Sequence, residues 1–319
     1  MGGSLVTQEQ LRDGLLGIAA PGAIGALGAF IGFWISSYLA RRDEQSRLAG
    51  RFERLGPTLG LGLAFVLVIW AIQGLPPTFK PGSISASHWQ FLLAIIGLVL
   101  ASAEALTNRA TKQPLVRWAG RFVLIAIILW FQHASARKNQ WDAGVETIAW
   151  TAGFGLWLVL AFGAMDLLQR KATAAPSAIS MAAIPLLSVP AIFDSGATAQ
   201  WQIAMGVGMA LVGIAIAGLL LRGRSLTPPV GTLFVLWLSG VLIVGHLYSE
   251  MPRWHAIILA AMPILLVLPE LKSKLSWKAK LIVRLALIAI AGGVISFQAA
   301  PEFVKTFTGG GATELDFYK

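Results

Sequence analysis

The residues best suited to chemistry in this sequence gather in the segment HLYSEMPRWH, which contains His246, Glu250 and His255. Imidazole and carboxylate groups are common ligands of divalent metals, and histidine also transfers protons near neutral pH. His246 and Glu250 are four residues apart, so they share a face wherever a helix continues that far. His246, Glu250 and His255 are therefore our candidates for a metal site or an acid–base site.

Two observations weigh against this site. The spacing differs from that of the zinc motif His-Glu-x-x-His, and Pro252 is expected to end a helix before His255. Other histidines and acids also lie beside apolar runs: His88, His133, Asp142, Glu146 and Asp194. Amphipathic side chains are typical of the boundary between membrane and water. We favour that boundary role, and we expect no cofactor.

Apolar runs dominate the elements that must position these residues. The chain has 319 residues, of which 56% are hydrophobic and 13% are charged, whereas a soluble domain carries about 25% charged residues. The apolar runs cover residues 14–40, 57–75, 88–108, 118–135, 144–168, 178–194, 200–221, 229–248, 253–270 and 281–298. Each is close to the roughly 20 residues that cross a bilayer as a helix. The sequence predicts an all-α, polytopic integral membrane helix bundle of about ten transmembrane helices.

The Lys and Arg residues alternate between many and few in the loops that separate these runs. The odd-numbered loops hold seventeen and the even-numbered loops hold four. Short basic loops stay in the cytoplasm, so the pattern places both termini on the exported side. A bacterial inner membrane fits this asymmetry, with the lipid bilayer as partner. The net charge of +10 lies in short clusters, without the basic stripe that nucleic-acid binding requires.

We predict one membrane domain over 1–319, with a flexible polar tail at 309–319. One internal organisation divides the chain into halves of opposite orientation, 1–174 and 175–308. Pro21 and Pro185 each lie about seven residues into the first span of a half, and broken helices at matched positions are typical of transporters built from inverted repeats.

The other internal organisation is a tandem repeat of four helices. His133 is followed eight residues later by Trp141, and His246 is followed eight residues later by Trp254. Both pairs lie in exported loops between equivalent spans. The two organisations exclude each other, and the sequence does not choose between them.

Small residues form a stripe on the first span that includes Gly25, Gly28 and Gly32. Such a stripe lets a neighbouring helix approach closely. Tight packing within the chain is the simpler interpretation. A contact between two copies of the chain, or with a partner subunit, is the alternative.

The polar and kinked positions inside the spans are few. Pro185, Ser188 and Pro190 lie in the sixth span, with Ser239 in the eighth and Pro263 in the ninth. Proline removes a backbone donor and bends a helix, so these five residues are our candidates for a substrate pocket at mid-depth, beside the alternative of a kink without a ligand.

Ionisable residues cluster near the basic loops. Asp166, Glu270 and Arg284 lie within a turn or two of them, and we expect these three to anchor the helices at the interface. Glu104 is the deepest, so we single it out as a buried acid with a functional role.

These features rank three functions. The first is a transporter or facilitator of a small neutral or lipid-like solute, because ten spans in about 300 residues match the size of several carrier families. The second is a non-catalytic membrane scaffold or a subunit of a larger membrane complex. The third is a membrane enzyme with its His and Glu site on the exported face.

Overall fold

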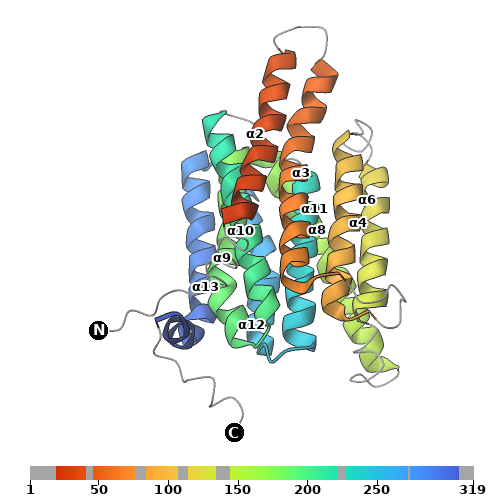
Figure 1. Ribbon diagram of the computed structural model, residues 1–319, viewed down its shortest axis with the longest axis vertical. Helices are drawn as coiled ribbons and strands as arrows, with labels where there is room; N and C mark the ends of the chain where they lie inside the picture. The colour runs from red at the N-terminus through yellow and green to blue at the C-terminus, as the bar shows by residue number, and fades with distance from the viewer. Residues whose placement is uncertain are drawn as a thin grey trace.

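The protein forms a bundle of long helices in a computed structural model, which describes residues 19–40, 46–75, 84–106, 114–133, 144–221, 228–271 and 274–308 (Figure 1). In chain order the long helices are α2 (Ala20–Ala40), α3 (Ser46–Gln73), α4 (Ala86–Leu106), α6 (Pro114–Ile127), α8 (Val145–Lys171), α9 (Ala174–Asp194), α10 (Thr198–Leu220), α11 (Pro228–Leu242), α12 (Arg253–Leu271) and α13 (Trp277–Thr308). Two short π-helices, η3 (Ile128–Gln132) and η4 (Ile243–Leu247), extend α6 and α11.

Ten helices in these described ranges are long and apolar enough to cross a membrane. The predicted all-α bundle with ten spans is therefore confirmed. The sixth span, which the sequence makes the shortest, is the continuous helix α9 of 21 residues with Pro185 and Pro190 inside it. A helix of that length crosses the hydrocarbon core at about 1.5 Å per residue.

Successive helices run in opposite directions, so their connections fall at two ends of the bundle (Figure 1). We call one the basic end, because the short connection from α8 to α9 follows Arg170 and Lys171 there. The start of α13, with Lys278 and Lys280, also lies there. The other is called the opposite end. It contains the connections from α9 to α10 and from η4 to α12.

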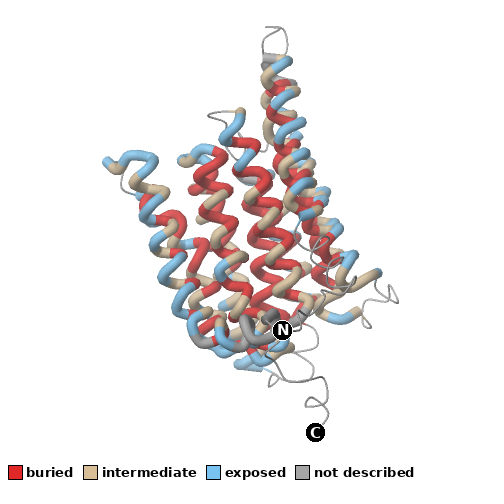
Figure 2. Tube along the Cα trace, turned by 60° about the vertical axis from the view of Figure 1, so that its left-hand side comes forward, coloured by how far each residue is buried: buried red, intermediate tan, exposed pale blue. Residues whose placement is uncertain are grey.

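The core of the bundle is built around α11. In its most apolar stretch 89% of the residues are buried, against 22% in α8 and α13. Helices α3, α4, α8 and α12 pack around it, while α2, α9 and α10 form a second group beside it. Phe234 and Trp237 of α11 are completely buried. Figure 2 shows this distribution, with buried residues on the inward faces and exposed residues on the outward faces.

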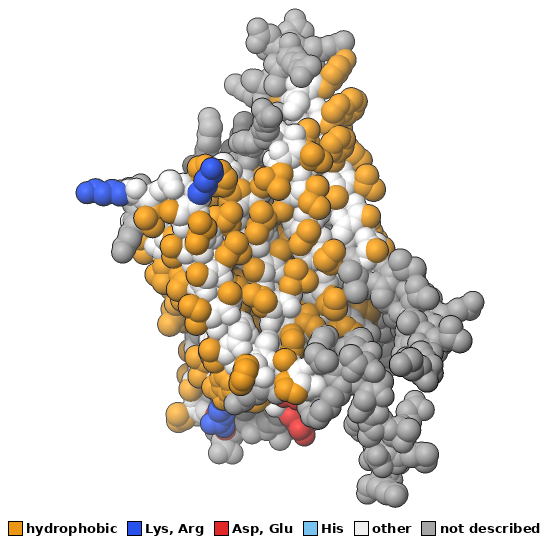
Figure 3. Space-filling view, turned by 90° about the vertical axis from the view of Figure 1, so that its left-hand side faces the viewer, with side chains coloured by type: hydrophobic (Ala, Val, Ile, Leu, Met, Phe, Trp, Pro, Cys, Tyr) orange, Lys and Arg blue, Asp and Glu red, His pale blue; other side chains and the backbone are white. Residues whose placement is uncertain are grey.

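The outer surface between the two ends is apolar. Leu160, Leu219, Ile290 and Phe297 are at least half exposed. On the face shown in Figure 3, hydrophobic side chains form a continuous band, and charged side chains appear only near the two ends. An apolar surface of this extent is unsuited to water, so it is the surface that a multi-pass protein presents to lipid.

The glycine stripe of α2 is used within the chain. A Cβ atom at Gly25 would lie 2.5 Å from the carbonyl oxygen of Ala210 on α10. Cβ atoms at Gly28 and Gly32 would lie 2.6 and 2.5 Å from the Cα atoms of Gly60 and Gly56 on α3. Helices of the same chain fill the surface through which we considered a contact between copies, so these three glycines are not available for it.

Three sequence predictions lie partly or wholly outside this description. The flexible tail at 309–319, Trp141 and Asp142 all lie outside the described residues. Each of α6 and α11 ends in a π-helix beside a histidine, in keeping with the four-helix tandem repeat. Both the tandem repeat and the division into halves at 174 stay predictions.

Candidate functional site at the opposite end of the bundle

The predicted mid-depth residues make local contacts. The Ser188 hydroxyl donates to the carbonyl of Pro185 at 3.0 Å, and the Ser239 hydroxyl donates to the carbonyl of Leu236 at 2.8 Å. Both serines are completely buried, and each donates within its own helix. Pro185 and Pro190 leave α9 continuous, so the sixth span is not a broken helix. Neither cavity described below is lined by Pro185, Ser188, Pro190, Ser239 or Pro263, and their role in substrate binding stays a prediction.

The predicted metal ligands are separated. His246 lies in η4, Glu250 is exposed in the following turn, and His255 is buried on α12 with its ring 3.9 Å from that of Trp254. Within the described parts of the chain, no three His, Cys, Asp or Glu side chains form a group that could hold a metal ion. The turn between η4 and α12 separates the two histidines, which explains why close spacing in sequence does not produce a metal site here.

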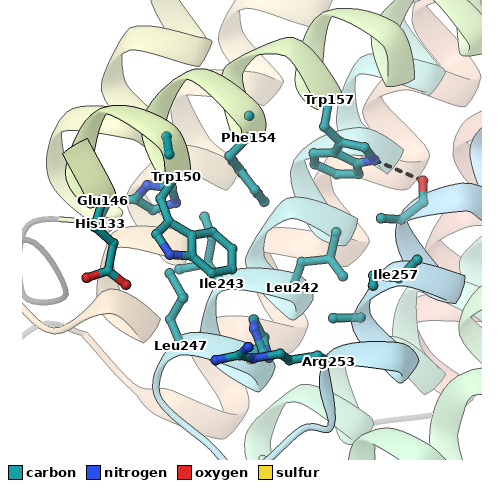
Figure 4. Close-up of a pocket in the computed structure, with 15 residues that line it drawn as sticks. His133, Glu146, Trp150, Phe154, Trp157, Leu242, Ile243, Leu247, Arg253 and Ile257 are labelled. Atoms are coloured by element: carbon teal, nitrogen blue, oxygen red, sulfur yellow. Dashed lines mark hydrogen bonds between the residues drawn. The ribbon is translucent and has the colours of Figure 1, made fainter. Parts of the chain in front are cut away.

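His246 instead faces a cavity of about 520 Å³ between α8, η4 and α12. Its walls are largely aromatic and aliphatic side chains, as Figure 4 shows. From α8 come Trp150, Phe154 and Trp157, and from the opposite wall come Leu242, Ile243, Leu247 and Ile257. Small-molecule pockets in proteins measure about 300–1,000 Å³ and are mostly apolar, so this cavity has the size and lining of a binding site.

The polar groups of the cavity gather where α8 and α12 begin. Glu146 is in the first turn of α8, Arg253 begins α12, and His133 and His246 lie at the ends of η3 and η4. The ring of His133 meets that of Phe154 edge-on at 5.0 Å, and the ring of His246 lies 5.9 Å from that of Trp150. The cavity therefore has a polar mouth and an apolar body.

Both π-helices contribute to this mouth. Tyr248, directly after η4, donates its hydroxyl to the carbonyl of Gln132 in η3 at 2.7 Å. Nδ1 of His246 lies 3.0 Å from the carbonyl oxygen of Met251. Because a carbonyl only accepts, Nδ1 carries the proton, and in the neutral ring Nε2 keeps its lone pair. π-Helical turns are frequent at functional sites, and here they turn both histidines toward one cavity.

The inner end of the cavity is closed by a hydrogen bond. The Trp157 indole donates to the carbonyl of Ala260 at 2.9 Å and joins α8 to α12 (Figure 4). Trp157 is twelve residues from the start of α8, so the cavity reaches about 18 Å along that helix. Gly153 is exposed and Ile257 is 68% exposed, so the cavity opens on the apolar outer surface rather than being enclosed.

A second polar cluster lies at the basic end. Arg117 and Arg121 of α6 bind Asp166 of α8, with N–O distances of 3.0 and 2.6 Å. Nη2 of Arg121 also donates to the hydroxyl of Thr232 on α11 at 3.2 Å. An oxygen of Glu104 lies 3.8 Å from Arg121 and 3.9 Å from Arg117, at charge–charge distance but beyond a hydrogen bond.

These contacts correct the expectation that the ionisable residues anchor the helices at the interface. Asp166 is only 6% exposed, Glu270 is 3% exposed and Arg284 is 1% exposed. Arg284 binds Glu270, which also binds Lys280 at 2.9 Å. A buried charge needs a partner, and each of these finds one on another helix or turn instead of reaching lipid headgroups.

Sequence reasoning missed the role of Arg117 and Arg121. We counted both as loop residues and began the fourth span at 118, whereas α6 begins at Pro114 and carries both arginines on its buried face. Their spacing of four residues, which places them on one helical face, was the signal that could have revealed them. His133 and Glu146 were noted only as boundary residues, and no local pattern connects them to His246.

Comparison of the chain with models of protein families, with curated proteins and with solved structures finds no match.

Proposed function

We propose that the protein binds a lipid-like molecule in the cavity between α8, η4 and α12 and moves it across a bacterial inner membrane. The observation that carries this proposal is the form of the cavity. Its polar groups are confined to the mouth, and its aromatic body opens on the outer surface near Gly153 and Ile257. An acyl chain can enter such a site directly from the bilayer while its polar head stays at the mouth.

The transport part of the proposal is supported by the architecture. Ten spans without a separate soluble domain are typical of carriers. The chain is a multi-pass protein whose long helices leave no room for one. A scaffold or subunit that only holds lipid in this cavity is the alternative, and it predicts binding without movement.

A membrane enzyme acting on the bound lipid is a second candidate, favoured by one observation. His133, Glu146 and His246 line the same cavity, and histidine and carboxylate side chains are the usual general acids and bases. If the protein is an enzyme, lipid recovered after incubation with it will be chemically changed, whereas a carrier returns it unchanged.

The proposal is tested by filling the cavity. Gly153 lines the cavity, and a Cβ atom there would meet no other atom within 4 Å. We expect Gly153→Leu to weaken the binding of a fluorescent fatty acid or a fluorescent phosphatidylcholine at least about tenfold, or 1.4 kcal/mol, because its side chain occupies the space of the ligand. The same variant should slow movement of the fluorescent lipid between the leaflets of proteoliposomes.

Gly163→Leu is the matched control for that experiment. Gly163 is on the same helix, a Cβ there also meets no atom within 4 Å, and the residue does not line the cavity. Its affinity should stay within about twofold of the original, since no contact with ligand changes. Equal affinity of the Gly153→Leu variant, or no saturable binding by folded protein, would rule out this site.

The orientation that we propose, with the basic end in the cytoplasm, has its own test. The chain contains no cysteine, so a single introduced thiol is unambiguous. We expect Glu250→Cys to react with a membrane-impermeant maleimide on intact cells, because it lies at the opposite end and is exposed. Ser276→Cys, exposed at the basic end, should react only after the membrane is permeabilised. The reverse pattern would invert the protein in the membrane.

A further inference from the structure

A second, smaller cavity of about 220 Å³ lies between α4, α6 and α11 at the basic end. Its polar lining consists of Glu104, Arg117, Arg121 and Thr232, and the rest is aliphatic. Arg121 is seven residues from the start of α6, or about 10 Å along the helix. This cavity does not share a residue with the larger one, so it is a separate place in the fold.

Two arginines on this cavity have more donors than acceptors. Arg117 is 6% exposed and Arg121 is 2% exposed. Asp166 and Thr232 accept from their Nη2 atoms. Within the described part of the chain, Nε of Arg117 and both Nε and Nη1 of Arg121 are buried without a hydrogen-bond partner. Buried donors are normally paired, so three unpaired nitrogens beside an open space indicate that an acceptor belongs there.

The charge of the cluster indicates what kind of acceptor. A guanidinium presents a planar fork of donors that matches the oxygens of a carboxylate or phosphate. Asp166 is held by direct bonds of 2.6 and 3.0 Å, whereas Glu104 interacts with both arginines only at 3.8 Å or more. An incoming anion can therefore take the place of the Glu104 charge without breaking a hydrogen bond between Glu104 and either arginine.

We propose that this cavity binds a small anionic group, a carboxylate or a phosphate, through Arg117 and Arg121. The volume of about 220 Å³ accommodates a headgroup or a free anion and not the body of a lipid. The lining includes Gly120, which is half-buried, and Val116, which is 52% exposed on the outer face of α6. The site is therefore within reach of the bilayer at the basic end as well as of the adjacent solution.

The variant that tests this proposal leaves every charge in place. A Cβ at Gly120 would meet no atom within 4 Å, so Gly120→Leu fills the cavity without touching the arginines. We expect it to weaken anion binding at least about tenfold. Arg121→Gln should have the same effect by removing donors. It also removes a partner of Asp166 and can unfold the chain, so the Gly120→Leu result decides.

The matched control is Gly293→Leu, on the exposed face of α13, where a Cβ also meets no atom within 4 Å. It should bind within about twofold of the original chain. The purified full chain in mild detergent is titrated with inorganic phosphate by calorimetry. Short-chain phosphatidic acid and short-chain phosphatidylcholine are compared by native mass spectrometry.

Each outcome decides something. Saturable binding of phosphate that Gly120→Leu weakens identifies a site for a free anion. Binding of phosphatidic acid alone, weakened by the same variant, identifies a site for an anionic headgroup. No saturable binding of either probe, or binding that Gly120→Leu leaves unchanged, overturns the proposal. Gly153→Leu should not affect this binding, so failure here is distinguishable from failure of the proposed function.

Discussion

Replacing Gly32 with valine should destabilise the protein by at least about 3 kcal/mol, at the upper end of the cost of overpacking. The added Cβ would lie 2.5 Å from the Cα of Gly56 and 2.6 Å from the carbonyl oxygen of Phe52, both backbone atoms of α3. Backbone atoms cannot turn aside as a flexible side chain can. The hairpin of α2 and α3 must therefore separate to admit the new side chain, and α2 loses contact along its length.

The measurement is the free energy of unfolding in mixed micelles, followed by circular dichroism. Gly293→Val is the matched control, because a Cβ at Gly293 would meet no atom within 4 Å. That change should cost nothing or stabilise α13 slightly, since glycine is the poorer helix former by about 0.5 kcal/mol or more. Equal stability of the two variants would mean that α2 and α3 are not as close as described.

The Asp166→Asn variant should lose about 3–5 kcal/mol of stability, the cost of leaving a buried charge without its partner. Asp166 is the one carboxylate within 3 Å of both arginines of α6 in the part of the chain that the structure describes. Asparagine has nearly the same volume, so the loss reports on charge and not on packing. Arg117 and Arg121 are buried, and without Asp166 their two positive charges repel each other with only Glu104 nearby.

Unfolding in mixed micelles measures this effect as well. Glu250→Gln removes an exposed carboxylate and should change the stability by no more than about 0.5 kcal/mol, as is usual for surface substitutions. A second substitution, Arg121→Met, should restore part of the stability lost in Asp166→Asn, because it removes one of the unpaired charges. If Asp166→Asn is as stable as Glu250→Gln, the buried ion cluster does not hold α6 against α8.

The two clusters of the protein differ in how far local sequence could predict them. The stripe Gly25, Gly28 and Gly32 predicted a close helix contact because spacings of three and four define one face of any helix. It did not identify the neighbours, since Gly25 meets α10 while Gly28 and Gly32 meet α3. The stripe alone was equally compatible with a second copy of the chain.

The larger cavity was less accessible to sequence reasoning. His246 was singled out correctly as a polar residue near apolar runs, but its predicted partners Glu250 and His255 do not face the cavity. The residues that do face it, such as Glu146, Trp150 and Arg253, come from two other helices. Close spacing along the chain suggested a site that a turn of the backbone then divided.

The sequence by itself determined the class of protein, the number of spans and the alternation of basic and weakly charged connections. Those properties depend on runs of about 20 residues and on the charges that flank them, and both are local along the chain. Only the tertiary structure decided that Arg117 and Arg121 are buried against Asp166, and that His133, Glu146 and His246 surround one cavity. Such contacts join residues 45 to more than 100 positions apart, and their energies depend on which helices pack together, which no local pattern records.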